Sequence, residues 1–174
     1  LNEVNLSGYN ISKLNDVSKF VQVEKLNISF NLFSEWGEDM RKGLLQMKLR
    51  WLNLSGNRFL NVKENGSDTF EIETLILARC LFKHTENWHI IVNWFTNVKK
   101  LDLGFNEFND ENFEGISLLR TIETIEYLEL NNNEFTQLKF VSDQWSSLRI
   151  LELSNSPIVK LVINLPKLES LDIS

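Results

Sequence analysis

The chain repeats one short pattern seven times and begins it an eighth time. The pattern reads leucine, two residues, leucine, one residue, leucine, two residues, asparagine, one residue, apolar residue. Its clearest copies occupy residues 49–59, 98–108 and 125–135. A pattern that returns every 20 to 27 residues indicates supersecondary units stacked into a solenoid, in which each unit contacts only its neighbours. Such a stack offers a long surface rather than a deep pocket, which favours binding over catalysis.

The repeat covers the whole chain, so we interpret residues 1–174 as one domain of about seven and a half units. The units begin at Leu1, Val23, Leu49, Ile72, Val98, Ile125, Leu148 and Leu168. The open ends of a solenoid need polar caps, and neither end of this sequence looks like one. We therefore expect a fragment of a longer protein whose terminal caps are missing.

The repeated pattern resembles the leucine-rich repeat family. Two features are most similar to extracellular Toll-like and invertebrate immune or adhesion proteins: unequal unit lengths, and an aromatic or apolar residue three positions before a unit. That residue is Phe20, Phe95, Trp145 or Leu165 in four units. The resemblance implies an α/β fold, a right-handed solenoid with a parallel β-sheet on its concave side. It also implies a convex side of mixed helical, 3-10 and extended segments.

The residues themselves agree with such a fold. Leu52 and Leu54 alternate with Trp51 and Asn53, the period-two pattern of a half-exposed strand. The asparagine of the pattern falls where the chain leaves the strand, and its amide can satisfy backbone groups there. We expect stacked amides, an asparagine ladder, at Asn31, Asn57, Asn106 and Asn133. Other units carry Tyr9, Cys80 and Ser156 at this position.

The longer units have room for helices on the convex side. We expect helical stretches within residues 35–47 and 110–124, the second capped at its N-terminus by Asn109 or Asp110. The short seventh unit should cross in extended or 3-10 form.

Several classes of function are disfavoured by what the sequence lacks. The net charge is −6 and no apolar run is long enough to span a membrane, so we expect neither nucleic-acid binding nor membrane contact within this fragment. No phosphate-binding loop or nucleophile motif occurs, so we expect no catalytic residues and no cofactor. Cys80, His84, Glu86 and His89 are residue types that bind metals, but a buried thiol beside surface histidines explains them better, and we predict no metal site.

Five Asn-x-Ser sequons make secretion and N-glycosylation plausible expectations. They lie at Asn65, Asn10, Asn27, Asn53 and Asn5. The last three fall at the centre of predicted strands, where a glycan would cover part of the concave face. Asn65 is the first candidate because it lies in a flexible-looking Glu-Asn-Gly-Ser stretch.

The outward strand positions define the predicted binding face. The candidate ligand-binding residues are Trp51, Ile76, Asp102, Phe105, Tyr127, Glu129, Ile150 and Glu152. Aromatic residues dominate interface hot spots, which singles out Trp51, Tyr127 and Phe105. Asp102, Glu129, Glu152 and Asp172 form an acidic column, and its negative charge would steer a basic partner.

We therefore expect a non-catalytic protein-recognition module, an extracellular segment of a leucine-rich repeat receptor or of a secreted immune or adhesion protein. Its partner would be a protein ligand or co-receptor, and it could form a homo- or hetero-dimer. The alternative is a cytoplasmic scaffold or adaptor, such as the substrate-recognition arm of a ubiquitin ligase.

Overall fold

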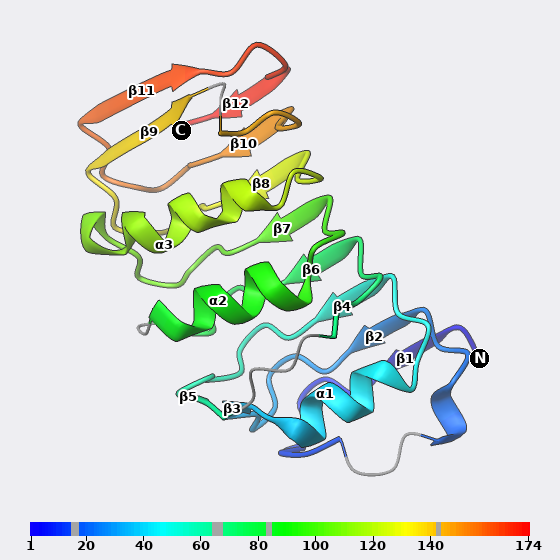
Figure 1. The fold of residues 1–174 in the computed structure, drawn as a ribbon. Coiled ribbons are helices and arrows are strands. Elements are labelled where there is room, and N and C mark those ends of the chain that lie inside the picture. Colours follow the sequence, from blue (N-terminus) through cyan, green and yellow to red (C-terminus); the bar gives the residue numbers. More distant parts are fainter. Residues whose placement is uncertain (15–17, 64–67, 83–84, 142–143) are drawn as a thin grey trace.

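A computed structural model describes residues 1–14, 18–63, 68–82, 85–141 and 144–174. Its main feature is one eight-stranded parallel sheet, to which each unit contributes one strand of three residues (Figure 1). The two ends of the chain lie at opposite ends of the stack. The strands, in their order across the sheet, are β1 (Glu3–Asn5), β2 (Lys25–Asn27), β4 (Trp51–Asn53), β6 (Thr74–Ile76), β7 (Lys100–Asp102), β8 (Tyr127–Glu129), β10 (Ile150–Glu152) and β12 (Ser170–Asp172). The predicted solenoid with a concave parallel sheet is confirmed.

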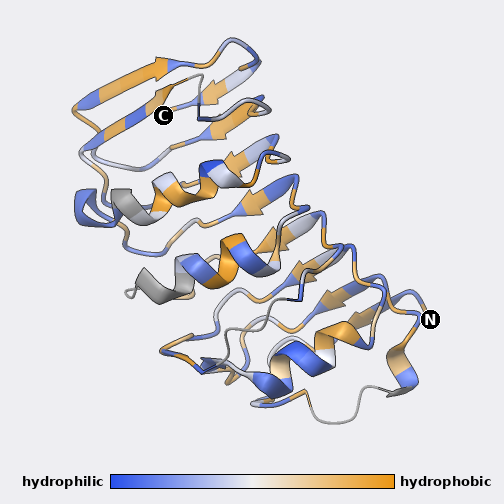
Figure 2. Ribbon diagram, viewed as in Figure 1, coloured by the Kyte–Doolittle hydropathy of each residue, from blue (hydrophilic) through white to orange (hydrophobic). Residues whose placement is uncertain are grey.

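The middle residue of each strand points into the core. Leu52, Leu75, Leu101 and Leu128 hold this position in four adjacent strands, and all four are fully buried. Their strand neighbours on either side are only half buried, as the period-two pattern requires. Figure 2 shows the resulting mixture of apolar and polar residues along the sheet. Because every unit contributes to one continuous apolar column, no unit has a core of its own.

Three α-helices of the described residues lie on the convex side of the sheet, and the second and third of them are neighbours, as Figure 1 shows. They are α1 (Glu38–Leu45), α2 (Thr85–Trp94) and α3 (Phe113–Leu118). Short 3-10 turns accompany them at η1 (Ser18–Phe20), η2 (Asp110–Asn112) and η3 (Leu119–Thr121). The helix predicted within residues 35–47 is confirmed, and the one predicted within 110–124 is divided into η2, α3 and η3. Helix α2 was not predicted, although Trp88 and Ile91 already place apolar residues three apart on its buried side.

Of the two alternatives for the N-terminal cap of the segment within residues 110–124, Asn109 is the one that caps it. The side-chain oxygen of Asn109 accepts the backbone N–H of Glu111 at 3.0 Å, which starts η2. Asp110, the other alternative, does not cap it. Its carboxylate accepts the backbone N–H groups of Thr136 and Gln137 at 2.8 and 3.0 Å. Asp110 therefore joins its unit to the next one instead of capping a helix.

Two further pairs of short strands lie outside the main sheet, in the extended crossings of the units. Strand β9 (Gln137–Val141) pairs in parallel with β11 (Lys160–Asn164) in the sixth and seventh units. Strand β3 (Glu35–Trp36) pairs likewise with β5 (Asn61–Val62) near the other end. The extended crossing predicted for the seventh unit is confirmed.

The four asparagines of the predicted ladder lie in the turns that follow β2, β4, β7 and β8, and each makes hydrogen bonds to the backbone. The oxygen of Asn106 accepts the backbone N–H of Cys80 at 2.8 Å, and its amide nitrogen donates to the carbonyls of Leu77 and Leu103, both at 2.9 Å. Asn133 repeats this arrangement one unit further on, accepting the backbone N–H of Asn106 at 3.0 Å. Asn31 and Asn57 make the equivalent bonds in the second and third units. Each amide therefore satisfies backbone groups of two successive units.

Aromatic rings of neighbouring units stack on one another in the core, away from the asparagine turns. Trp36 stacks on Phe59 at a centroid distance of 4.1 Å, and Phe59 stacks on Phe82 at 6.0 Å. These three rings come from the second, third and fourth units, so they form a continuous contact across two joints. All three are buried.

Candidate binding surface on the concave sheet

The predicted outward residues lie in register across the concave sheet. Strand pairing produces two adjacent columns. The central column is Asn5, Asn27, Asn53, Ile76, Asp102, Glu129, Glu152 and Asp172. The preceding column is Glu3, Lys25, Trp51, Thr74, Lys100, Tyr127, Ile150 and Ser170. The structure thus brings seven of the eight candidate ligand-binding residues together on one face, and Phe105 lies at the turn that follows β7.

The apolar members of this face are less exposed than simple alternation predicts. Trp51, Ile76 and Ile150 are each half buried, because the side chains of adjacent strands cover part of them. Phe105 is 40% exposed. Each of these groups therefore offers only part of its apolar surface to a partner.

A network of side chains joins the later strands. The hydroxyl of Tyr127 donates to Glu152 at 2.8 Å. The amide nitrogen of Asn131 donates to Glu152 at 3.1 Å and to Glu129 at 3.3 Å. The amide oxygen of Asn131 accepts the backbone N–H of Ser154 at 2.7 Å, which fixes the direction of that amide. Both glutamates are therefore held in place before any partner arrives.

The acidic column carries more negative charge than its surroundings neutralise. Burial raises the pKa of Asp102, and the charge of Glu152 adds to that effect. Burial also raises the pKa of Glu129, followed by the charges of Asp102 and Glu152. The ammonium of Lys100 lies 4.1 Å from the centre of the Tyr127 ring. Its positive charge lowers the pKa values of Asp102 and Glu129, but not enough to offset the effects that raise them. Burial and the hydrogen bond to Glu152 raise the pKa of Tyr127, so its hydroxyl stays a donor.

The turn at the end of each strand contains a feature that the sequence prediction missed. The residue before each ladder position has a positive φ between 52° and 76°. These residues are Gly8, Phe30, Gly56, Arg79, Phe105, Asn132 and Asn155. Glycine and asparagine suit this conformation, and their recurrence could have revealed it. Phenylalanine and arginine adopt it at a cost of about 1–2 kcal/mol each, and Phe105 is contacted by the Arg79 guanidinium at 4.0 Å from the ring centre.

The three strand sequons share one geometry. The side-chain oxygens of Asn5, Asn27 and Asn53 each accept the backbone N–H of the serine two residues later, at 3.1, 3.1 and 2.9 Å. This bond turns each amide nitrogen, the atom that carries a glycan, away from the backbone. Asn10 lies exposed in the first turn. Asn65 lies outside the described residues.

The residues considered for metal binding do not form a cluster in the part that the structure describes. The Cys80 thiol is buried and donates to the carbonyl of Leu54 at 3.4 Å. Burial raises its pKa to about 12. His89 is exposed on α2. His84 and the side chain of Glu86 lie outside what the structure describes.

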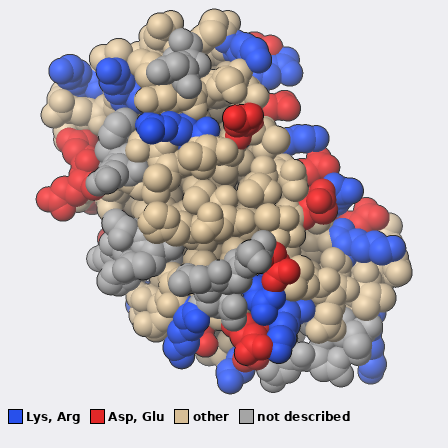
Figure 3. All heavy atoms as spheres, in the orientation of Figure 1, with Lys and Arg blue, Asp and Glu red and all other residues tan. Residues whose placement is uncertain are grey.

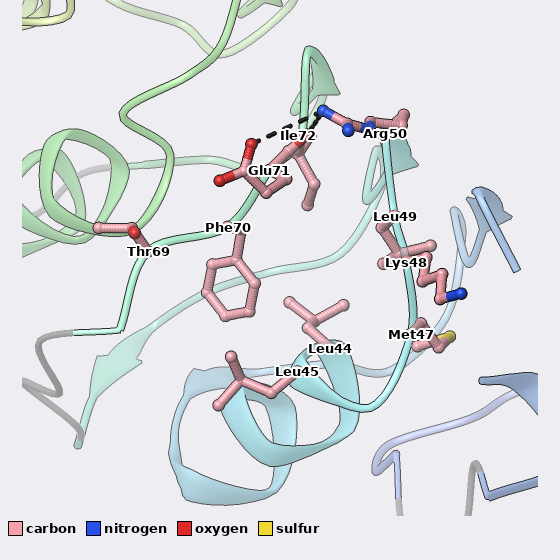
Figure 4. Close-up of a pocket in the computed structure, with 10 residues that line it drawn as sticks. All are labelled: Leu44, Leu45, Met47, Lys48, Leu49, Arg50, Thr69, Phe70, Glu71 and Ile72. Carbon is pink, nitrogen blue, oxygen red and sulfur yellow. Dashed lines mark hydrogen bonds and ion pairs between the residues drawn. The ribbon is translucent and has the colours of Figure 1, made fainter. Parts of the chain in front are cut away.

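A surface hollow of about 350 Å³ lies between the end of α1 and the segment before β6 (Figure 4). Leu44, Met47 and Phe70 line its apolar wall, and Arg50 and Glu71 form an ion pair of 3.6 Å at its mouth. The hollow is therefore an apolar recess with charged groups at its rim.

Charged residues elsewhere are mixed in sign. On the face shown in Figure 3, lysines, arginines and acidic residues surround a broad uncharged area. No helix among the described residues is long and apolar enough to cross a membrane.

Comparisons with known proteins agree with this architecture. A family model described as Leucine Rich Repeat matches residues 48–70. The fold is similar to that of human 5T4, also named Wnt-activated inhibitory factor 1 or trophoblast glycoprotein. The TM-score is 0.75 at 19% identity, covering 99% of this chain and 70% of that one. It is also similar to internalin C2 from Listeria monocytogenes, with a TM-score of 0.56 at 16% identity, covering 99% of this chain and 80% of the other. No curated protein matches the chain in sequence.

Proposed function

We propose that this leucine-rich repeat solenoid is a non-catalytic recognition module that binds a protein ligand on its concave face. We further propose that it is an extracellular segment of a receptor or of a secreted immune or adhesion protein. Leucine-rich repeat domains generally bind proteins, and the arrangement of this concave face suits that use.

The acidic column is the observation that carries the proposal. Asp102, Glu129 and Glu152 occupy one register position on three adjacent strands, which lie about 4.8 Å apart. Burial and the neighbouring carboxylates disfavour the charged forms of Asp102 and Glu129, and a cation supplied by a partner would relieve this. The column therefore favours a partner that presents lysine or arginine side chains.

The neighbouring column supplies the apolar part of the proposed interface. Tyr127 and Ile150 lie side by side on adjacent strands, directly next to the acidic column. The contacts with Lys100 and Glu152 hold the Tyr127 ring in place before a partner binds. Little side-chain entropy is therefore lost when a partner covers this ring. Tyr127 is therefore the proposed hot spot, and the carboxylates set the charge of the partner.

The proposed extracellular location is supported by the sequons. Asn5, Asn27 and Asn53 all leave their amide nitrogens directed away from the backbone. The name of one structural neighbour, trophoblast glycoprotein, describes a glycosylated protein with this fold.

The interface is tested by screening the chain against an array of secreted and cell-surface proteins. Any partner found is then measured against two variants. Tyr127→Ala should weaken binding by about tenfold or more, as at other aromatic hot spots. Glu129→Gln should slow association and reduce its dependence on salt. Glu111→Gln, on the convex η2, is the matched control and should change neither.

The sign of the partner's charge is tested separately with short peptides. A tetra-arginine peptide should bind more strongly than tetra-glutamate, and Glu129→Gln should reduce the difference. Equal binding of the two peptides, or an undiminished partner affinity in both concave variants, would exclude this face. Production in a eukaryotic secretory host tests the location. If glycosidase treatment leaves the mass unchanged, the cytoplasmic scaffold becomes the better hypothesis.

A further inference from the structure

An exposed apolar patch lies beside the first two turns, outside the concave face. Phe30 is 57% exposed and Leu32 is 56% exposed, although both belong to a unit covered on either side by neighbouring units. Phe30 also holds a positive φ of 52°. The Phe30 ring lies against the backbone of Gly56 in the third unit, and more than half of the residue is exposed to water. A bulky residue in a costly conformation, with so much exposed surface, is a candidate for a further contact.

Asn10 is fixed next to this patch by the ladder. The backbone N–H groups of Tyr9 and Ile11 both donate to the side-chain oxygen of Asn31, each at 3.0 Å. The backbone N–H of Leu32 donates in turn to the carbonyl of Ile11 at 2.8 Å. Asn10 is thus held between two residues anchored to the unit that carries the patch. Its own φ of 58° makes it the apex of the turn.

Asn10 is also the first residue of the sequon Asn10-Ile11-Ser12, and both Asn10 and Ser12 are exposed. Among the described residues, the Asn10 side chain makes no hydrogen bond that would hold its amide back. A glycan attached to Asn10 would therefore lie close to the apolar patch formed by Phe30 and Leu32.

We propose that Asn10 carries an N-linked glycan whose first sugars lie on Phe30 and Leu32. One face of an N-acetylglucosamine ring consists of C–H groups. Placing this face against an aromatic ring removes apolar surface from water on both sides. The hydroxyl groups of the sugar remain in solvent. The glycan would thus cover the patch and keep it from aggregating.

The modification is an ordinary group transfer. The donor is an oligosaccharide linked to a lipid through a diphosphate. The amide nitrogen of Asn10 forms a bond to C1 of the first sugar, and the bond between C1 and the diphosphate oxygen breaks. The lipid diphosphate leaves, and the amide gives up one proton to a base of the transferring enzyme. The inference rests on the proposed extracellular function, because this donor is met on the secretory route.

The experiment compares secreted forms of the chain from a eukaryotic host. Peptide mass spectrometry first determines which sequons carry glycan. Ser12→Ala removes the sequon while leaving Asn10 in place, and Ser12→Thr preserves the sequon as a control. We expect Ser12→Ala to lower the melting midpoint by about 2–4 °C, the range for one lost contact in a chain of this size. Ser12→Thr should not lower it.

The contact with Phe30 is tested by repeating the comparison in two backgrounds. Phe30→Asn removes the ring and places at this turn the residue that Asn132 and Asn155 already supply at equivalent turns. Ser12→Ala should then change the midpoint by less than about 1 °C, since contacting groups are non-additive. Phe105→Asn is the matched control, because Phe105 lies in an equivalent turn three units away. In that background Ser12→Ala should still lower the melting midpoint by the full 2–4 °C expected above, that is by about as much as in the wild type.

Three other outcomes would overturn the inference. An equal loss in the Phe30→Asn background would show that the glycan does not lie on that ring. Glycan at other sequons with Asn10 unmodified would reject this site while leaving the proposed extracellular function standing. A chain with no glycan at any sequon would reject both.

Discussion

The hydroxyl of Tyr127 on β8 donates a 2.8 Å hydrogen bond to Oε1 of Glu152 on β10. This bond connects the preceding column of the concave sheet, which contains Tyr127, to the acidic residues of the central column. Tyr127, the proposed hot spot, and Glu152, one of the carboxylates proposed to select a basic partner, are therefore coupled. A partner that moves one of these side chains must also disturb the other.

Tyr127→Phe isolates this hydrogen bond. The ring and its contact with Lys100 remain, but Glu152 loses a donor, so we expect the free energy of unfolding to fall by about 1 kcal/mol. Chemical denaturation measures the change. Tyr9→Phe is the control, because the Tyr9 side chain is 70% exposed and its hydroxyl should contribute nothing. Equal losses in both variants would contradict the prediction.

Glu129→Gln should stabilise the fold at neutral pH. Burial and two neighbouring carboxylates raise the pKa of Glu129 in the folded state. Between the unfolded value of about 4.3 and that raised pKa, the folded state binds more protons than the unfolded state. The stability of the wild type therefore falls as pH rises through this interval and then levels off. Melting curves should show the variant above the wild type at pH 7 and level with it near pH 3.

Asp110→Asn should act in the opposite direction. Hydrogen bonds from the Thr136 hydroxyl and from the backbone of Gln137 and Thr136 lower the pKa of Asp110. The stability contributed by its charged form is present above about pH 4 and is lost as pH falls through the lowered pKa. The variant should therefore melt below the wild type at pH 7, and the gap should close in acid. Asp39→Asn, at a loose exposed ion pair of 3.8 Å with Lys13, should show little gap at any pH.

Gly56→Ala should be more destabilising than Gly8→Ala. Both glycines hold a positive φ, at 70° and 76°, where a side chain costs about 1–2 kcal/mol. A methyl group at Gly8 meets no atom within 4 Å, whereas at Gly56 it would lie 2.5 Å from Cδ1 of Phe30. We expect a loss of about 1 kcal/mol for Gly8→Ala and about 2 kcal/mol or more for Gly56→Ala. Equal losses would show that the Phe30 ring moves aside freely.

Asn106→Ala should be among the most damaging single changes. Its buried amide serves the backbone N–H of Cys80 and the carbonyls of Leu77 and Leu103. Removing it leaves several buried groups without partners, at about 1–3 kcal/mol each, so we expect a loss of about 3 kcal/mol or more. Asn93→Ala, at an exposed site on α2, should change the free energy of unfolding by less than about 0.5 kcal/mol.

The parts of the fold that depend on periodicity were predictable from the sequence. Leucine spacing placed Leu52 and Leu101 inward and Trp51 and Asp102 outward, because alternation along a strand has only two possible directions. The ladder positions of Asn106 and Asn133 followed from the same frame. Register across the sheet then needed no further information.

The remainder depends on contacts between units, which a linear pattern does not contain. Asp110 has the residue type of a helix cap, but Thr136 and Gln137 of the next unit compete successfully for its carboxylate. Asn131 was not singled out because its role depends on two glutamates, one of them on another strand. The positive φ of Phe30 and Phe105 was missed because neither residue type suggests it.

The replacement of a ladder asparagine by Cys80 has a mechanical consequence. Where other units offer a side-chain amide to the preceding unit, Cys80 has only its thiol, which donates to the carbonyl of Leu54 at 3.4 Å, and a thiol is a weak hydrogen-bonding group. On the opposite side of the same joint, Phe59 and Phe82 stay stacked. At the turn, the joint between the third and fourth units therefore has a weaker side-chain bond than the joints made by asparagine, although the backbone N–H of Gly56 still donates to the carbonyl of Ala78 at 2.9 Å. Under mechanical load or on heating, we expect the solenoid to bend at this joint. The contact of the Cys80 thiol should break first, while Phe59 and Phe82 remain stacked.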